Sequence, residues 1–510
     1  YILFFKMKDY IKNFNLILIF LFLLSLSYFQ AKNQSFGYVI DQDWTIIYNS
    51  LLIISNFEQE YIDHPAYTTF AIYGLILKTL NLFFNNLNLD ILNILDNSDP
   101  GNNLQKIFTL IRIFNSVIIF LIFWTIYKTL KLFNLKEIYN QLILLTFLFF
   151  ESNYQLLFLL RSEALSVLFF LFSNFYFIKY LKNEFMKKNI LLGSIFFALS
   201  ILAKTQVILL FFGMPFIYIF LNEKFFKNNG LIIKNTFFDK VIFIFGSLAI
   251  LVSILLYFKY PAPTDLVFFS LYLFVYLFFY SFFNKINFTN IKKIINFIYL
   301  FIFGIFITFF IIIVLDITKI IQFDYSIIPN NFARPITHMS SFTGYNITDN
   351  NFVNILERVQ KNIFNLNFII ILLMKNIFII FFIPFIFLYI SKTRNKLNIF
   401  YTIFIFLNFL FISIIFLVFR SQPFYQIYLI PLTLFLLLEL AFMDRKKIFI
   451  LFIFLFTLTN FNAVYQTISI GFKPERTVIN LCGYSKPNWN MVNRNLGNYD
   501  KFQSLFCKFK

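Results

Sequence analysis

Residues 108–130 read FTLIRIFNSVIIFLIFWTIYKTL, an apolar stretch of the length that one helix needs to cross a lipid bilayer. Comparable runs recur along most of the chain, separated by polar loops of different lengths. They predict an all-α polytopic membrane protein with about thirteen membrane-spanning helices. The predicted spans are 14–29, 108–130, 141–158, 164–181, 190–203, 207–221, 241–258, 265–283, 296–315, 367–390, 399–419, 427–443 and 448–464.

Composition supports a membrane location. The 510 residues are 60% hydrophobic and only 13% charged, whereas soluble domains are about 45–50% apolar and about 25% charged. A soluble core of this composition would expose large apolar patches. The formal charge of +19 does not indicate a nucleic-acid partner, because lysine and arginine collect in particular short loops. The lipid bilayer is the partner that this composition predicts.

Basic residues alternate from loop to loop, which predicts the orientation of the spans. Every second loop is rich in lysine and arginine, and the short loops between them hold about one basic residue each. The positive-inside rule therefore places the basic loops and the N-terminus in the cytoplasm, and the C-terminus on the outer face. The basic loops hold Lys131/Lys136, Lys179/Lys182/Lys187/Lys188, Lys224/Lys227/Lys234/Lys240, Lys285/Lys292/Lys293, Lys392/Arg394/Lys396 and Arg445/Lys446/Lys447.

The segment 67–84 is also apolar, but a span there would invert every later loop. We therefore predict a helix that lies at the membrane interface or dips into the membrane. Residues 1–465 then form one transmembrane domain, with outer loops at about 30–107 and about 316–366. Residues 466–510 form a small outer tail that holds both cysteines. These cysteines form a disulfide or remain two free thiols.

Missing motifs exclude several function classes. The 12 glycines form no phosphate-binding loop of the GxxxxGK[ST] or GxGxxG type. The two histidines form no HExxH motif, and no CxxC pair is present. ATP-driven pumping and nucleotide-sugar chemistry on the cytoplasmic face are therefore not expected.

The densest polar cluster lies in the first outer loop. Five carboxylates and one of the two histidines fall between residues 41 and 64. Asp43 precedes the amphipathic pattern of Trp44, Ile47, Tyr48, Leu51 and Leu52, which predicts a helix lying flat on the bilayer. The helix dipole at its N-terminus favours an ionised Asp43. Such a carboxylate can accept a proton from a hydroxyl nucleophile.

This loop resembles the first periplasmic loop of GT-C membrane glycosyltransferases. The similarity is to the branch of protein O-mannosyltransferases and bacterial aminoarabinose transferases, and it lies in Asp43-Trp44, Tyr48-Asn49-Ser50 and Tyr61-Ile62-Asp63-His64-Pro65. With weaker matches that follow in the same order, the resemblance extends over about 390 residues of the chain. The weaker matches are Ile111-Arg112-Ile113-Phe114-Asn115-Ser116, Arg161-Ser162-Glu163-Ala164-Leu165, Gly193 with Leu199-Ser200-Ile201-Leu202-Ala203-Lys204, and Tyr425-Gln426-Ile427-Tyr428-Leu429-Ile430-Pro431-Leu432.

The resemblance implies a GT-C-like fold and an inverting sugar transfer on the periplasmic face of a bacterial cytoplasmic membrane. The donor would be a sugar on a polyprenyl phosphate. The acceptor hydroxyl would belong to a lipid-linked glycan, lipid A, a surface polymer or a protein. Asp43 would be the general base. Asp41 is an alternative, because five positions separate Asp43 from Tyr48 where the family commonly has four.

The resemblance also implies binding roles for charged and polar residues. The leaving phosphate needs positive charge directed at it, and the candidates are Lys204, Arg112, Arg161, His64 and Arg420. The candidates for substrate binding are Tyr48, Asp63, Glu163, Arg334 and His338. No cofactor is required, and a divalent ion, if one binds, would be held by Asp63 and His64.

Two other functions fit part of the pattern. A polysaccharide ligase or polymerase uses a late outer loop with arginine and histidine, which residues 316–366 provide. A lipid or glycan flippase has a similar number of spans, but its charges are expected within the bundle near the bilayer midplane. Apart from Lys375 and Glu439 the predicted spans hold few such charges, and the acidic first loop favours the glycosyltransferase.

Overall fold

The computed structural model is almost entirely helical over the residues that it describes. The described residues are 2–34, 38–39, 43–59, 66–84, 87–91, 93–94, 99–182, 186–207, 210, 214, 217, 221, 291–322, 396–413, 423–442, 446–472, 479–480 and 504. The predicted spans at 241–258, 265–283 and 367–390, and most of 207–221, lie outside them.

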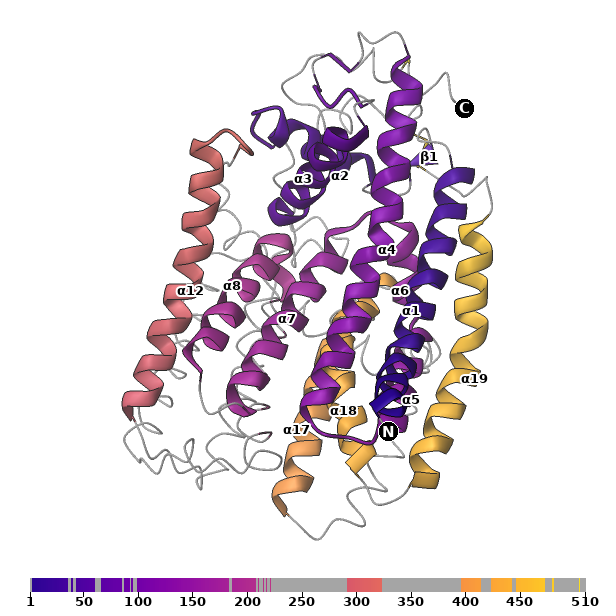
Figure 1. Ribbon diagram of the computed structural model, residues 1–510, viewed down its shortest axis with the longest axis vertical. Helices are drawn as coiled ribbons and strands as arrows, with labels where there is room; N and C mark the ends of the chain where they lie inside the picture. Colours follow the sequence, from indigo (N-terminus) through magenta and orange to yellow (C-terminus); the bar gives the residue numbers. More distant parts are fainter. Residues whose placement is uncertain are drawn as a thin grey trace, which may run out of the picture.

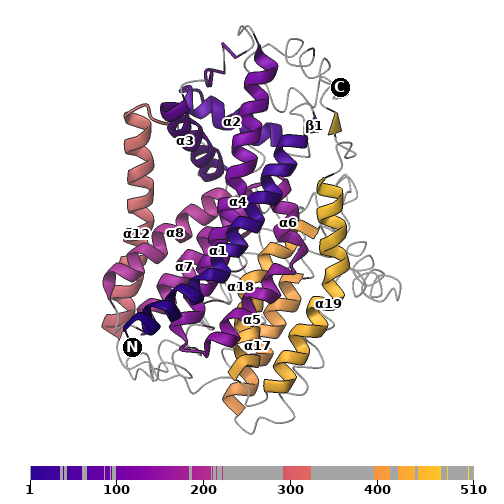
Figure 2. The same cartoon turned by 45° about the vertical axis from the view of Figure 1, so that its right-hand side comes forward.

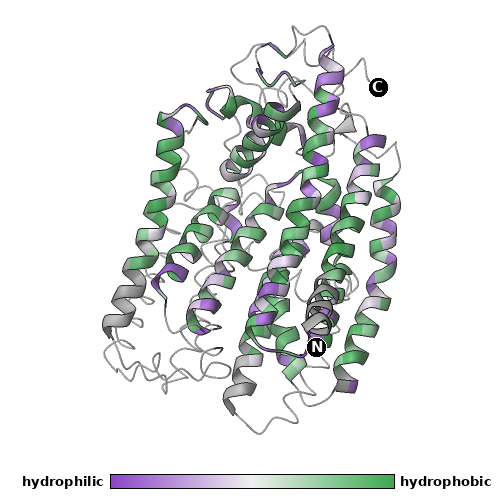
Figure 3. Cartoon of the chain, viewed as in Figure 1, coloured by the Kyte–Doolittle hydropathy of each residue, from purple (hydrophilic) through white to green (hydrophobic). Residues whose placement is uncertain are grey.

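Long helices packed side by side form a bundle, with two shorter helices, α2 and α3, at one end (Figure 1). Hydrophobic residues dominate the bundle helices (Figure 3). The α-helices are α1 Ile2–Asn33, α2 Asp43–Ile54, α3 Tyr67–Phe84, α4 Pro100–Leu132, α5 Glu137–Leu148, α6 Glu151–Phe158, α7 Ser162–Lys182, α8 Lys187–Ala203, α12 Ile291–Ile317, α17 Lys396–Ser413, α18 Ile430–Phe442 and α19 Lys446–Gly471. The 3-10 helices are η1 Thr205–Val207 and η6 Pro423–Leu429.

Five of the described helical segments are long and apolar enough to cross a membrane. They are Phe14–Asn33, Pro100–Leu132, Ser162–Lys182, Tyr425–Phe442 and Phe449–Gly471. The prediction of a multi-pass helical membrane protein is confirmed at this level. The predicted spans 190–203 and 296–315 lie within α8 and α12, and the described part of 399–419 lies within α17.

The predicted span 141–158 is not one straight helix. α5 and α6 meet at an angle of 57° around Phe149 and Phe150, and together they make a sixth candidate span. Beyond the break, the Asn153 Nδ2 donates a hydrogen bond of 2.7 Å to the Phe147 carbonyl of α5. A side chain that binds a backbone carbonyl competes with the helical ladder, which accounts for the bend.

The segment after α1 and the segment after α19 lie at the same end of the bundle. Strand β1 (Tyr38–Val39) pairs antiparallel with β2 (Ile479–Asn480), with Tyr38 opposite Asn480 and Val39 opposite Ile479. The start of α1 lies at the opposite end (Figures 1 and 2). The residues that closely follow α1 and α19 therefore meet at one end of the bundle.

α2 does not lie flat on the bilayer, so that prediction is wrong. All twelve of its residues are buried within the protein. α3 packs against one side of it, and Gly74 makes the close approach possible: a Cβ there would lie 2.6 Å from Ile54 Cγ2 and 2.9 Å from the Ser50 carbonyl. Elsewhere the Trp44 ring stacks on Phe108 of α4 with ring centroids 6.3 Å apart. The apolar positions of α2 thus contact protein instead of lipid.

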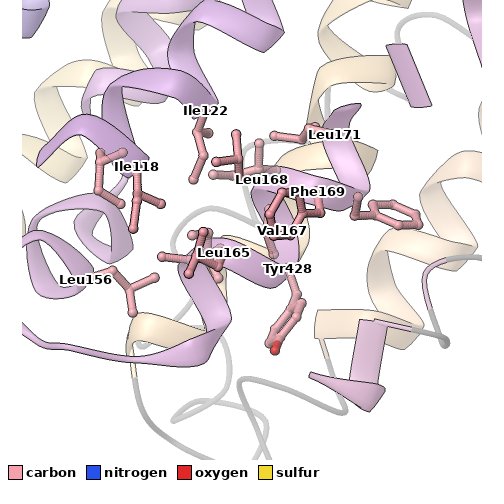
Figure 4. Packing of buried hydrophobic residues seen from close by; sticks show 14 of the residues in the cluster. Ile118, Ile122, Leu156, Leu165, Val167, Leu168, Phe169, Leu171 and Tyr428 are labelled. Carbon is pink, nitrogen blue, oxygen red and sulfur yellow. The ribbon is translucent and has the colours of Figure 1, made fainter. Parts of the chain in front are cut away.

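The core beneath α2 and α3 is built from α4, α6, α7 and η6. Figure 4 shows Ile118 and Ile122 of α4, Leu156 of α6 and Tyr428 of η6 around a row of α7 side chains. Two serines bring α7 and α8 together, since the Ser200 hydroxyl donates to the Ser166 carbonyl at 2.6 Å and the Ser166 hydroxyl donates to the Ser200 carbonyl at 3.1 Å. This packing fixes the start of α7 and the end of α8, where charged side chains gather.

Candidate active site

Asp43 is the first residue of α2 and is fully buried. Its Oδ2 lies 3.3 Å from the Arg112 Nη2 of α4, and its Oδ1 accepts a hydrogen bond of 2.9 Å from the Leu160 N–H. Each carboxylate oxygen therefore has a donor, as a buried charge requires. The position at a helix N-terminus adds the favourable end of the helix dipole.

Arg112 is also fully buried. Its Nη1 donates to the Gln34 carbonyl at 3.2 Å, just after α1, and its guanidinium lies 5.2 Å from the centre of the Phe108 ring. The Ser27 hydroxyl donates to the Arg112 carbonyl at 2.6 Å, which joins α1 to α4 at the same level. Arg112 therefore links the ends of α1 and α2 through one planar cation.

A second buried ionic cluster contains Glu163, Arg161 and Lys204. The Glu163 Oε1 lies 3.3 Å from the Arg161 Nη1 and 3.3 Å from the Lys204 Nζ. The side chains of Glu163 and Lys204 are 0% and 2% exposed, and that of Arg161 is 7% exposed. Glu163 is the second residue of α7, and Lys204 follows the last residue of α8. The contacts between Ser166 and Ser200 hold these helix ends together.

The two ionic clusters are neighbours. Leu160, whose N–H contacts Asp43, directly precedes Arg161, and three residue steps separate it from Glu163. The Cα atoms of Leu160 and Glu163 are therefore no more than about 11 Å apart. The segment between α6 and α7 thus connects the two clusters through the four consecutive residues 160–163. Asp43 pairs with Arg112 on one side of this segment, and Glu163 pairs with Arg161 and Lys204 at its end.

Asn115 and Tyr73 join the site without having been assigned a role from the sequence. The Asn115 Nδ2 donates to the Leu156 carbonyl and, at 3.1 Å, to the Leu159 carbonyl, while its Oδ1 accepts from the Tyr73 hydroxyl at 3.1 Å. Burial raises the pKa of Tyr73, and the nearby charge of Asp43 raises it further. The signal in the sequence was spacing, since Asn115 lies one helical turn after Arg112.

Tyr48 lies five residues after Asp43 in α2 and was expected to bind substrate. It is fully buried, and its ring centre lies 5.6 Å from that of Trp44. The Tyr48 side chain therefore packs in the protein interior and helps to hold α2, the helix that begins with Asp43.

The other predicted site residues lie outside the described part of the chain. They are Asp41, Asp63, His64, Arg334, His338 and Arg420. The predicted divalent ion at Asp63 and His64 is likewise untested. In the part of the chain that the structure describes, no group of three or more His, Cys, Asp or Glu side chains could hold a metal ion.

Comparison with known proteins leaves the family open. No family model, no curated protein and no solved structure matches this chain.

Proposed function

We propose that this protein is a GT-C-type membrane glycosyltransferase that moves a sugar from a polyprenyl phosphate to a hydroxyl acceptor, with inversion at the anomeric carbon. The observation that supports this best is the buried pair of Asp43 with Arg112, next along the segment between α6 and α7 to the buried cluster of Glu163 with Arg161 and Lys204. A carboxylate next to several cations suits a reaction that removes a proton at one point and develops negative charge on a phosphate at another.

In this proposal the acceptor oxygen attacks the anomeric carbon while the bond from that carbon to the phosphate oxygen breaks. The hydroxyl proton passes to Asp43, and the electron pair of the broken bond remains on the lipid phosphate. Arg161 and Lys204 bind that phosphate, and Glu163 holds both cations in place. Arg112 keeps its bond to the Gln34 carbonyl when Asp43 becomes protonated, so its charge stays partnered.

The site would face the outer side of a bacterial cytoplasmic membrane, with the N-terminus in the cytoplasm and the tail outside. This orientation rests on the positive-inside rule. No cofactor is required in the scheme. A divalent ion would be held by Asp63 and His64, and Arg334, His338 and Arg420 would complete donor and acceptor binding.

A transporter of lipid-linked glycans is the second candidate. The observation that favours it is Glu439, which is 2% exposed within the candidate span Tyr425–Phe442. Acidic residues inside membrane spans commonly lie on transport pathways. A glycan ligase or polymerase shares the outer-face location but would rely on residues 316–366.

The donor class can be tested with membranes that contain the protein. Such membranes are supplied with radiolabelled undecaprenyl phosphate sugars and, separately, with preassembled lipid-linked oligosaccharides. The proposal expects label from a monosaccharide donor to enter a glycosylated product. Transfer only of preassembled glycans would indicate a ligase, and movement of labelled lipid across the bilayer without transfer would indicate a flippase.

A further inference from the structure

One peptide unit lies between two buried polar side chains. The carbonyl of the Leu159–Leu160 peptide accepts from the Asn115 Nδ2 at 3.1 Å, and the N–H of the same peptide donates to the Asp43 Oδ1 at 2.9 Å. The peptide is trans, since the described residues contain no cis peptide bond. Its two polar ends therefore point in opposite directions, one towards α4 and one towards α2.

The contacts close into a ring. Arg112 and Asn115 lie one turn apart on α4, so their side chains project from one face. Arg112 binds Asp43, Asp43 binds the Leu160 N–H, and the carbonyl of that peptide binds Asn115. Asp43, Arg112 and Asn115 are each 0% exposed. No member of the ring can rotate without breaking a buried hydrogen bond, which costs about 1–3 kcal/mol per group left unpaired.

Asn115 also ends α6. The last carbonyls of a helix have no partner within it. The Asn115 Nδ2 donates hydrogen bonds to two of them, the carbonyl of Leu156 and, at 3.4 Å, the carbonyl of Leu157. The chain is extended at Leu159 and reaches Arg161 two residues later. On the other side, the hydroxyl of Tyr73 from α3 fixes the Asn115 amide. The orientation of this amide therefore decides where the segment that leads to Arg161 begins.

We infer that Asn115 is a positioning residue for the proposed transfer: it fixes the Leu159–Leu160 peptide, and through that peptide the orientation of Asp43. Tyr73 supports it by holding the amide in place. The functional part of this inference rests on the proposed function. The hydrogen-bonding part does not, because exchange of the Leu160 amide can be measured without any substrate.

The test uses the full-length protein in detergent or nanodiscs with Asn115→Ala, and with Asn140→Ala as the matched control. Asn140 is also fully buried, but its Nδ2 donates to Glu137, the first residue of α5, and so lies at the end of α5 that is away from α6. Hydrogen–deuterium exchange of peptides containing Leu160 is expected to be at least about tenfold faster in Asn115→Ala and unchanged in Asn140→Ala, since exchange reports local opening.

Transfer kinetics test the functional part. Misplacement of a reacting group by about 1 Å can lower a rate on the order of 100-fold. Asn115→Ala should therefore lower kcat on the order of 10- to 100-fold. KM for the donor should change by less than about threefold, since Arg161 and Lys204 remain on Glu163. Tyr73→Phe removes only one hydroxyl. It should also raise the exchange rate at Leu160 and lower kcat, each by a smaller factor than Asn115→Ala. This second variant keeps the inference testable if Asn115→Ala does not fold.

Each outcome decides a separate point. If amide exchange at Leu160 is unchanged in Asn115→Ala, the ring of hydrogen bonds does not hold this peptide. If Asn115→Ala does not fold, unchanged exchange in a folded Tyr73→Phe leads to the same conclusion. Faster exchange with wild-type kcat would overturn the positioning role. A wild-type protein that transfers no sugar would refute the proposed function, and the exchange comparison would still decide whether Asn115 fixes the peptide beside Asp43.

Discussion

Asp43 and Arg112, 69 residues apart in the sequence, form an ion pair of 3.3 Å in which both side chains are fully buried. Such a pair is costly to assemble, because both charges leave water. It is also costly to break, since one charge would remain buried alone. The pair joins α2 to α4 and gives the N-terminus of α2 one defined position.

Loss of Arg112 should therefore destabilise the protein more than loss of both partners. Arg112→Met leaves Asp43 buried without its guanidinium and should cost about 3–5 kcal/mol. Asp43→Asn combined with Arg112→Met should recover a large part of that cost. Unfolding of the purified variants in one detergent measures this. Equal destabilisation in the single and the double variant would mean that the pair is not coupled.

Lys204 should matter for the donor phosphate. A hydrogen bond from a charged group contributes about 1.5–3 kcal/mol, so Lys204→Gln should raise the donor KM by about 10- to 100-fold. Lys128→Gln is the matched control, because Lys128 lies on the exposed face of α4, 5.4 Å from the Trp124 ring. If both substitutions leave KM unchanged, Lys204 does not bind the phosphate.

The burial of Tyr73 predicts a loss of stability at high pH. Burial raises the pKa of Tyr73 above its ordinary value of 10.0, and the charge of Asp43 raises it further. Below pH 10 the hydroxyl is protonated in the folded and the unfolded protein. Above pH 10 only the unfolded protein ionises, so stability falls by about 1.4 kcal/mol per pH unit from this residue.

Comparison with Tyr73→Phe isolates that contribution. The difference in unfolding free energy between wild type and Tyr73→Phe should be constant up to about pH 10 and then shrink or reverse sign. A difference that is independent of pH from 7 to 11.5 would show that Tyr73 titrates equally in both states.

Gly74 should tolerate no side chain. A Cβ at this position would lie 2.6 Å from Ile54 Cγ2 and 2.9 Å from the Ser50 carbonyl, so α2 and α3 would have to separate. Gly74→Ala is expected to cost about 1–3 kcal/mol, the usual range for overpacking. The midpoint of thermal unfolding measures this. A midpoint equal to or above that of wild type would mean that α2 and α3 are not packed at this distance.

The pairing of β1 with β2 can be tested by cross-linking. Tyr38→Cys with Asn480→Cys, in a background with Cys482→Ser and Cys507→Ser, places two thiols directly opposite each other. Directly opposed residues have Cα atoms about 4.5–5.5 Å apart, within the range that a disulfide bridges. Mild oxidation should produce a faster-migrating species that reductant abolishes. Its absence from the double variant, or its presence in either single variant, would contradict this pairing.

Hydropathy predicted the long helices well, because lipid-facing spans need little beyond an apolar run of sufficient length. α4, α7 and α19 lie close to their predicted positions for that reason. The bend between α5 and α6 was not predictable from hydropathy, since it depends on the contact of the Asn153 side chain with Phe147. The burial of α2 was also missed, because an apolar face turned to protein and one turned to lipid have the same sequence pattern.

For the candidate site, the sequence predicted which charged residues lie near the outer membrane boundary, but it did not predict which of them form ion pairs. The structure pairs Arg161 with Glu163, two residues further along the chain. The partner of Asp43 depends on how α2 meets α4, which no local pattern encodes. Tyr73 was overlooked because a single tyrosine among 29 resembles apolar filler until its hydroxyl meets a buried amide.

The most direct test of the proposed activity is the rate of sugar transfer by Asp43→Asn relative to wild type, in membranes with matched expression and a polyprenyl phosphate sugar that wild type uses. The substitution keeps the shape of the side chain and removes its ability to accept the proton. The account predicts that the rate falls by at least about 100-fold, as for loss of a general base, while labelled polyprenyl phosphate still binds. Transfer at the wild-type rate would contradict it and would remove Asp43 from the reaction.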